Sequence, residues 1–360
     1  MANFINDTIN ENQLQTAFNN FVLRFQASSS TSIEAIINGL STDPIIIYPF
    51  DNKFYFNAKA YLKALFDNNF QDTIVIMTNI SNINSFYFID ETIMKQVFIE
   101  IEIRRTGPSQ FLEKNVRVIR GVNNIRRNLA IEENNPPYTQ VLQPNIVYWQ
   151  GYPLDITIHN YNNEFFNFSQ TLFNITRYNI VRLIISSGNN QIPLSSPIQE
   201  GVNDYMVNSG QATATIKTIT NASECGIYIK WINEYGTYSY YLFNDKYIED
   251  LVSSQDEVVN NNFENFSQTI SKELVLSRNS RNRLTCIAKK TGEYERDLLY
   301  SLGTSPKIWL YTKEKNQSST NQDWYEIQLN GHTFPVNTPN RKFIDIEYEF
   351  VFPENNKQSI

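Results

Sequence analysis

The stretch from Cys225 to Asp245 constrains the fold of this chain more than any other. It reads CGIYIKWINEYGTYSYYLFND. Apolar side chains alternate along its first half, which is the period-2 pattern of a half-buried β-strand. Asn233 to Gly236 supplies turn chemistry, and residues 237–243 are again rich in β-branched and aromatic side chains. Two such segments joined by a short turn containing glycine predict a β-hairpin.

We expect this hairpin to lie in the core of a β-sandwich. Its predicted core side chains are Ile227, Ile229, Trp231, Tyr238, Tyr240 and Leu242. The alternative is a carbohydrate-stacking platform of Tyr235, Tyr238 and Tyr240, because an exposed tyrosine ring can stack on a sugar while its hydroxyl stays in water. No histidine or cysteine lies between the two strands, so the hairpin predicts no chemistry of its own.

Length and composition predict a multidomain, mainly β protein. A chain of 360 residues exceeds one ordinary core, so we expect antiparallel β-sandwich domains, immunoglobulin-like or jelly-roll-like, with a few short helices. Aromatic residues make up 14% of the chain and charged residues 19%, which is typical of a globular protein. The net charge of −7 argues against a dedicated nucleic-acid binder, because phosphate neutralisation needs a basic surface.

Two features bear on where such a chain works. The start, MANFINDTINENQ, lacks the basic and apolar regions of a signal peptide, and no apolar run has the length of a membrane-spanning helix. The two cysteines, Cys225 and Cys286, fall in different predicted domains. We therefore expect no disulfide framework, no membrane contact and assembly in a reducing cytoplasm.

Turn-rich and proline-rich segments predict four parts of the chain. These are an N-terminal arm (1–30), a β-rich domain (31–135), a central β-sandwich domain (136–262) and a C-terminal α+β domain (263–360). The arm has a weak helical period, carried by Leu14, Phe18, Phe21 and Phe25. Residues 132–144 have the composition of an interdomain linker, and the polar residues 245–266 are interpreted as a connector.

Short helices are predicted at residues 58–66 and 293–302, among many strands.

The last predicted strand has an unusual charge pattern. Its apolar side chains Ile344, Ile346, Tyr348, Phe350 and Phe352 alternate with Asp345, Glu347 and Glu349. Such alternation predicts one buried face and one acidic face.

A basic stretch in this acidic chain is the candidate inter-subunit contact. Its arginines are Arg104, Arg105, Arg117, Arg120, Arg126 and Arg127. We expect it to contact the acidic face of Asp345, Glu347 and Glu349 on a neighbouring copy, because identical acidic subunits repel unless opposite charges meet. The alternatives are a solvated face, which is what charge runs usually form, and contact with DNA in a channel, which the net charge disfavours.

Motifs for catalysis, cofactors and metals are absent from the sequence. His159 and His332 are the only histidines, and no Cys-x-x-Cys pair, Gly-x-Ser-x-Gly elbow or phosphate loop occurs. We therefore expect no metal, no cofactor and no enzyme activity. A glycosidase needs two converging carboxylates, and a pair such as Asp155 with Glu164 has no specificity among 37 acidic residues.

Four segments resemble the virion proteins of tailed bacteriophages, in particular crAss-like and related phages. They read IKWINEYGTYSYYLF, LLYSLGTSPKIWLYTKEKN, DWYEIQLN and FIDIEYEF. The resemblance implies a non-enzymatic structural protein that forms a homo-oligomeric ring in the tail or neck of the virion and is assembled in the host cytoplasm. Its implied partners are copies of itself and other virion tail or neck proteins. The alternatives are a receptor- or carbohydrate-binding tail module and a polysaccharide depolymerase.

Overall fold

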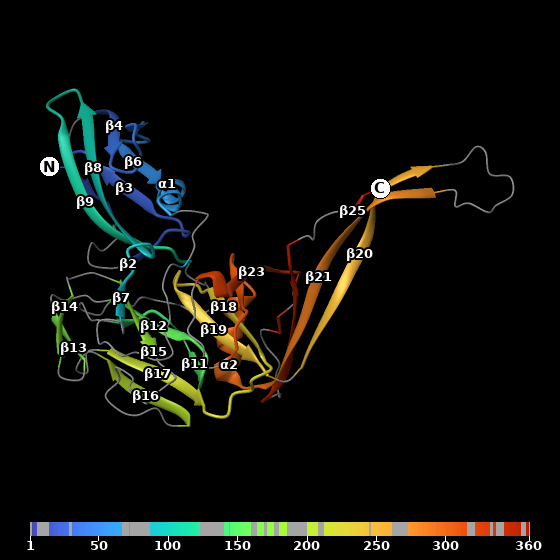
Figure 1. The fold of residues 1–360 in the computed structure, drawn as a ribbon. Helices are drawn as coiled ribbons and strands as arrows, with labels where there is room; N and C mark the ends of the chain where they lie inside the picture. Colours follow the sequence, from blue (N-terminus) through green and yellow to red (C-terminus); the bar gives the residue numbers. More distant parts are fainter. Residues whose placement is uncertain are drawn as a thin grey trace.

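The fold comes from a computed structural model, drawn as a ribbon in Figure 1. The described residues are 2–5, 14–28, 31–66, 72, 87–122, 140–143, 145–159, 164–168, 171–175, 180–185, 200–207, 212–244, 246–260, 273–314, 321–331, 334–335, 342–353 and 358–359. Within them the chain is mainly β, with several antiparallel sheets and two α-helices, which confirms the predicted fold class. Arg126, Arg127, His332 and all but residues 140–143 of the predicted linker lie outside the described residues.

The N-terminal body is a two-layer β-sandwich. One sheet has the strand order β2-β9-β8-β4-β5 and the other the order β1-β3-β6. The bounds are β1 Asn3–Phe4, β2 Leu14–Thr16, β3 Val22–Gln26, β4 Ser32–Asn38, β5 Ile45–Ile47, β6 Lys53–Asn57, α1 Lys59–Ala64, β8 Met94–Arg105 and β9 Gln110–Ile119. Both sheets and α1 bury apolar side chains in one shared core. The helix lies within the predicted span 58–66.

Residues 2–5 and 14–28, the described part of the predicted arm, belong to this body and form strands. Phe21, Leu23 and Phe25 are all buried in the shared core, with the period of two that a strand requires. The helical interpretation used spacings of three and four that passed over Leu23. The prediction of a separate arm is therefore wrong, because β3 pairs with β1 and β6 and packs these side chains into the shared core.

The middle of the chain forms three sheets. Their strand orders are β10-β12-β15-β7, β11-β17-β16 and β13-β14. The bounds are β7 Tyr87–Ile89, β10 Gln140–Val141, β11 Ile146–Trp149, β12 Leu154–His159, β13 Glu164–Phe168, β14 Thr171–Ile175, β15 Ile180–Ile185, β16 Gly201–Val207 and β17 Ala212–Ile219. Most pairs are antiparallel, whereas β11 runs parallel to β17.

The last third of the chain completes an eight-stranded sheet. Its order is β19-β18-β22-β23-β24-β21-β20, with β25 paired to β21. The bounds are β18 Ile227–Ile232, β19 Tyr238–Phe243, β20 Lys246–Asn260, β21 Glu273–Thr291, α2 Glu293–Leu302, β22 Ile308–Tyr311, β23 Trp324–Leu329, β24 Ile344–Val351 and β25 Gln358–Ser359. The predicted helix at residues 293–302 is confirmed, and so is the hairpin, as β18 and β19.

One hydrophobic core joins the predicted central and C-terminal domains. It extends from Ile146 to Phe350, and β18 pairs directly with β22 across the predicted boundary at residue 262. Across the boundary at residue 135, β7 pairs with β15. These boundaries do not separate independent cores. Proline-rich and polar segments mark where the chain leaves a sheet, but strands from both sides of them pair again.

The β18–β19 hairpin is covered on both faces. Ile229, Trp231, Tyr238, Tyr240 and Leu242 are buried and Ile227 is half-buried. On one face, the Trp231 Nε1–H donates to Ser301 Oγ of α2 at 2.9 Å. On the other face, Lys230 and Tyr240 point toward β12 and β15. The prediction of a half-buried strand is wrong in this respect, because a second layer covers the face expected to meet water.

The turn of this hairpin attaches the N-terminal body to the central core. The Val122 N–H, just after β9, donates to the Glu234 carbonyl at 2.8 Å. Gly236 has a φ of 74°, and a Cβ at this position would lie 1.6 Å from the Arg120 carbonyl oxygen. Glycine is therefore required here both for the backbone conformation and for the close approach of the two segments.

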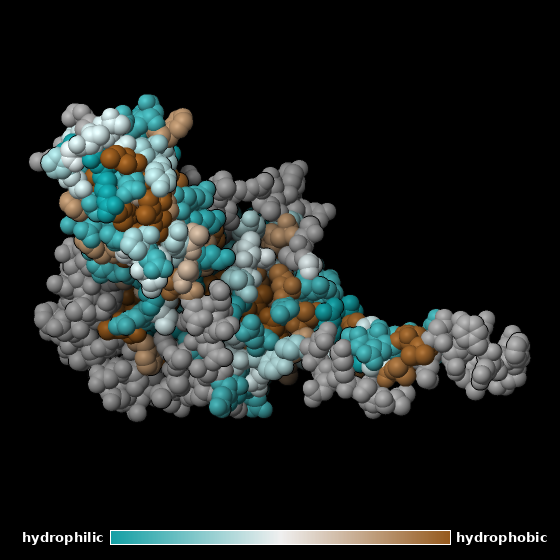
Figure 2. Space-filling model, turned by 90° about the horizontal axis from the view of Figure 1, so that it is seen from above, coloured by the Kyte–Doolittle hydropathy of each residue, from teal (hydrophilic) through white to brown (hydrophobic). Residues whose placement is uncertain are grey.

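Beyond β24, β20 and β21 continue as a ribbon that is two-stranded except where the short β25 pairs with Ser277 and Arg278. The two strands have 15 and 19 residues, so the longer one is about 60 Å long. Figure 1 shows this ribbon leaving the molecule on the side away from the N-terminal body. Hydrophobic and hydrophilic residues lie side by side along it in Figure 2, and Leu251 is 67% exposed. The described part of the predicted connector, residues 246–260, is thus a strand whose polar composition reflects its exposure.

We expect Trp231→Ala to lower the free energy of unfolding by about 3–5 kcal/mol, because it leaves a cavity beside α2 and removes the bond to Ser301. Urea denaturation followed by circular dichroism measures this. The control is Tyr325→Ala on β23, where the side chain is 45% exposed. Equal effects of the two substitutions would contradict the position of Trp231 in the core.

Candidate functional site: a buried ion-pair network

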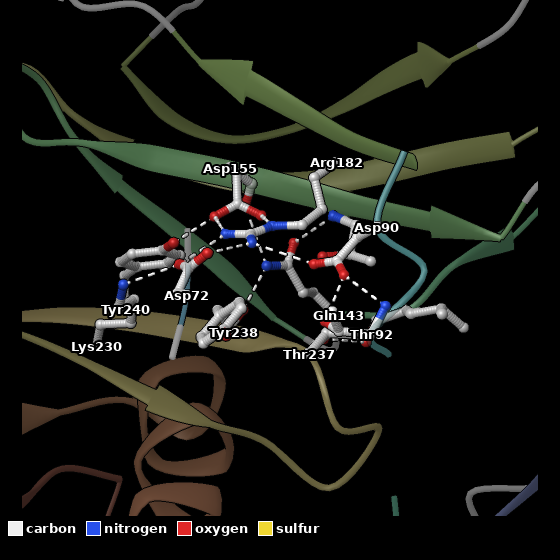
Figure 3. A network of polar contacts seen from close by, with 12 residues as sticks. Asp72, Asp90, Thr92, Gln143, Asp155, Arg182, Lys230, Thr237, Tyr238 and Tyr240 are labelled. Carbon is white, nitrogen blue, oxygen red and sulfur yellow. Dashed lines mark hydrogen bonds and ion pairs between the residues drawn. The ribbon is translucent and has the colours of Figure 1, made fainter. Parts of the chain in front are cut away.

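Charged side chains gather between two layers of the central core. Figure 3 shows them between the β12–β15 pair and the β18–β19 hairpin, with α2 on the far side of the hairpin. We define the buried ion-pair network as Asp72, Asp90, Asp155, Arg182 and Lys230. Asp155 and Lys230 lie on β12 and β18, and Arg182 lies on β15. Asp90 directly follows β7, and Asp72 precedes that strand in the chain.

Register places Arg182 beside Asp155. Arg182 is the pairing partner of Thr157, and Asp155 lies two residues away on the same strand face. Both side chains are completely buried. The sequences around them, IVRLII and LDITIH, are otherwise mostly apolar. Both strands are therefore buried in the core, and the two charged side chains are buried with them.

All five N–H donors of the Arg182 guanidinium are used. Two bonds go to the Asp155 carboxylate, from Nε at 2.8 Å and from Nη2 at 2.9 Å. Two more go to Asp72, from Nη1 at 2.7 Å and from Nη2 at 3.1 Å. The fifth runs from Nη1 to Asp90 at 3.3 Å. This guanidinium has no donor left for a ligand.

Lys230 is the second cation of the network. Its Nζ donates to the Asp72 carboxylate at 2.9 Å. The ammonium also lies 4.3 Å from the ring centroid of Trp324 and 5.4 Å from that of Trp309, and the Arg182 guanidinium lies 4.4 Å from the ring of Tyr238. Aromatic faces attract cations, so these rings replace part of the hydration that the two groups lose.

Neutral groups donate further hydrogen bonds to the carboxylates and to backbone carbonyls around the network. The Tyr240 hydroxyl donates to the Asp155 carboxylate, and the Thr92 N–H donates to Asp90 at 2.9 Å. Gln143 connects the two layers, since its Nε2 donates to the Asp155 carbonyl at 3.0 Å and also to the Tyr238 carbonyl of β19. Such satisfied polar networks specify one arrangement of their segments.

The electrostatics follow from burial and pairing. Burial alone would raise the pKa of Asp72, but the charges of Arg182 and Lys230 hold it well below its usual value of 3.8. Burial acts to lower the pKa of Arg182, yet Asp155 and Asp72 raise it well above its usual value. For Lys230 burial outweighs the attraction of Asp72, and the pKa is lowered. Burial, followed by the charge of Asp155, raises the pKa of Tyr240.

The network therefore cross-links the fold. Its five members come from two predicted domains, and the Trp309 and Trp324 rings beside Lys230 come from a third. Arg182 and Asp155 are fully buried, and Lys230 is 2% exposed, so a substrate in solution meets none of these groups. Among the described residues no group of three His, Cys, Asp or Glu side chains could hold a metal ion. Nor is any helix in the described part long and apolar enough to cross a membrane.

The structure does not bring the predicted basic residues together on one surface. Arg104 is exposed and pairs with Glu34 at 2.9 Å. Arg117 and Arg120 are buried, at 8% and 7% exposure, and the Arg120 guanidinium lies 5.6 Å from the ring centroid of Phe66. The contact prediction is wrong for Arg117 and Arg120, because the packing of the N-terminal body on the central core already covers them.

Arg105, the remaining described arginine of that set, donates from Nε to the Pro108 carbonyl at 2.6 Å. The acidic side of the predicted contact also bonds within the chain in part. Asp345 accepts from the Lys290 N–H at 2.8 Å, and Glu349 pairs with Arg283 at 3.5 Å. Glu347 is exposed, as its strand alternation predicts.

Two other candidate groups are also buried. Tyr238 and Tyr240 are 1% and 2% exposed, so the predicted sugar-stacking platform is wrong. Asp155, offered as one carboxylate of a glycosidase pair, is fully buried against Arg182, and the side chain of Glu164 lies outside the described residues.

The cysteines are both free, with Cys225 exposed and Cys286 buried.

None of the predictions from the sequence included this network. A signal was present, because Asp155, Arg182 and Lys230 each interrupt a strand that is otherwise mostly apolar. A charge at such a position must find a partner in the core. Asp72 and Asp90 carried no comparable local signal.

Comparison with known proteins adds no family to this picture. No protein-family model matches the chain, and a search of curated proteins finds no match either.

We expect Arg182→Met to lower the free energy of unfolding by about 3–5 kcal/mol, because it leaves buried carboxylates without their cation. Chemical denaturation measures the change. The matched control is Arg104→Met, whose guanidinium forms an exposed ion pair and whose loss should leave stability unchanged within error. A stability of Arg182→Met equal to that of the unmodified chain would contradict the proposed role of the network.

His159 predicts a pH dependence. Burial, with a smaller effect of the Arg117 charge, lowers the pKa of His159 from 6.5 to about 4. Between these values the unfolded chain binds a proton that the folded protein does not, so stability falls as the pH is lowered through this window, by on the order of 3 kcal/mol. His159→Gln should reduce the slope of unfolding free energy against pH between 6.5 and 4. Parallel slopes for the two proteins would show that His159 does not cause the loss.

Proposed function

We propose that this chain is a non-enzymatic structural subunit that forms a homo-oligomeric ring in the tail or neck of a tailed bacteriophage virion. The single observation that carries the assembly part is the β20–β21 ribbon. A two-stranded ribbon in water is marginal by itself, and exposed apolar side chains on a long edge strand favour association. On β20 such side chains include Tyr247, Ile248 and Leu251, which are 47%, 45% and 67% exposed.

The buried ion-pair network supports the same proposal. A subunit of a ring must hold its contact surfaces in one relative position, because small angular errors accumulate around the ring. The network and the Gly236 contact attach the N-terminal body, the central sheets and the base of the ribbon to one core. A rigid body with a projecting ribbon suits repeated contacts between copies.

The virion part of the proposal rests on the sequence resemblance. The first resembling segment lies at residues 229–243 and the other three lie within residues 298–350, and they fold together as β18, β19, α2, β22, β23 and β24. Trp231 of the first segment donates to Ser301 of the second. Resembling segments that fold together as one unit support the proposal better than segments scattered over the surface.

We expect the purified chain to sediment as one closed oligomer over a wide concentration range. A ribbon-deletion variant, with residues 251–282 replaced by Asn-Gly, should stay monomeric with an intact body. The cut keeps the Asp250–Arg283 pair, at 3.2 Å, next to a two-residue turn that suits a hairpin. Sedimentation velocity measures the oligomeric state, and near-UV circular dichroism measures whether the body is still folded. A monomeric unmodified chain that binds glycans on an array would instead favour the receptor-binding alternative.

A further inference from the structure

Two glutamates lie directly opposite each other on the outer face of the N-terminal body. Glu100 on β8 and Glu113 on β9 are pairing partners, and like charges in this position destabilise a sheet. Neither forms an ion pair with any residue that the structure describes. The neighbouring acids differ, since Glu34 and Glu102 bind Arg104 at 2.9 and 3.4 Å.

Exposed aromatic rings flank this glutamate pair. Phe98 precedes Glu100 by two residues and Phe111 precedes Glu113 by two, so all four side chains point to the same face. Phe98 is 53% exposed and Phe111 is 59% exposed. We call these four residues the acidic face. Two carboxylates between two aromatic rings suit an arginine, which can bind carboxylates and stack on a ring at the same time.

One face of the ribbon offers such a group. Arg281 on β21 is exposed, and its pairing partner is Val252 on β20. Ile248, 45% exposed, lies on the same face. Arg283 on that face is already paired with Asp250, at 3.2 Å. Arg281 forms no ion pair with a described residue, so its charge is available to another molecule.

We propose that Arg281 of one copy binds between Glu100 and Glu113 of a second copy, with Ile248 and Val252 of the same ribbon face against Phe98 and Phe111. This inference rests on the proposed function as a ring subunit and names the contact that builds the ring. Figure 1 shows β8 and β9 at the edge of the N-terminal body farthest from the ribbon, so the ribbon does not reach the acidic face of its own chain. A contact between two different surfaces of identical copies is head-to-tail, and it closes into a ring when the rotation per copy allows.

Charge reversal tests this contact by sedimentation equilibrium. Arg281→Glu should weaken association between copies by at least about tenfold, as expected for a buried arginine anchor. The matched control is Arg278→Glu, three residues away on the same strand. Its side chain is also exposed, but it pairs with Gln255 and therefore points to the opposite ribbon face. This control should associate like the unmodified chain. Arg281→Gln serves as a milder second variant if the reversal disturbs folding, which the melting temperature reports.

Rescue makes the assignment specific. Glu100→Lys together with Glu113→Lys should also weaken association, whereas mixing this variant with Arg281→Glu should restore a contact between unlike copies. Restored mixed oligomers support the proposal. If the unmodified chain assembles but Arg281→Glu associates equally well, or the mixture gains nothing, this contact is overturned while the ring proposal stands. If the unmodified chain is monomeric at every concentration, both proposals are overturned.

Discussion

The five hydrogen bonds of the buried Arg182 guanidinium hold together segments that are remote in sequence. Its partners Asp72, Asp90 and Asp155 precede it by up to 110 positions along the chain. Removing charges from water costs several kcal/mol per ion, so such a network adds little net free energy to the fold. Its main effect is to restrict these segments to one packing arrangement. Any other docking of these segments would leave a buried charge without a partner, and that cost is large.

This constraint reaches beyond the central core. Lys230 lies on the hairpin whose turn touches the end of β9, so the network and the attachment of the N-terminal body share one element. The opposite face of that hairpin packs on α2, next to the sheet that continues into the ribbon. The acidic face and the ribbon are thus connected through one packed body. Two surfaces held in this way can meet their counterparts on neighbouring copies with a constant geometry.

Particular elements show what could be predicted and why. The hairpin, the helix at residues 293–302 and the strands Ile146–Trp149 and Leu154–His159 were predictable, because each has a periodic or continuous apolar pattern. Residues 14–28 were misinterpreted because aromatic spacing imitates a helix when Leu23 is passed over. Residues 246–260 were misinterpreted because an exposed strand has the composition of a loop. Arg117 and Arg120 were placed on a surface because a run of charges does not reveal which side chains another layer covers.

The sequence by itself determined the β class, the hairpin and the presence of charges inside mostly apolar strands at Asp155, Arg182 and Lys230. These properties are local, since they depend on residues within a few positions of one another. Only the tertiary structure decided that these charges meet, that Asp72 and Asp90 join them, and that one core spans the predicted domain boundaries. The physical reason is that pairing partners, burial and charge compensation depend on contacts between distant segments. The same reason separates Arg281, left in solvent by a projecting ribbon, from Arg120, covered by a neighbouring layer.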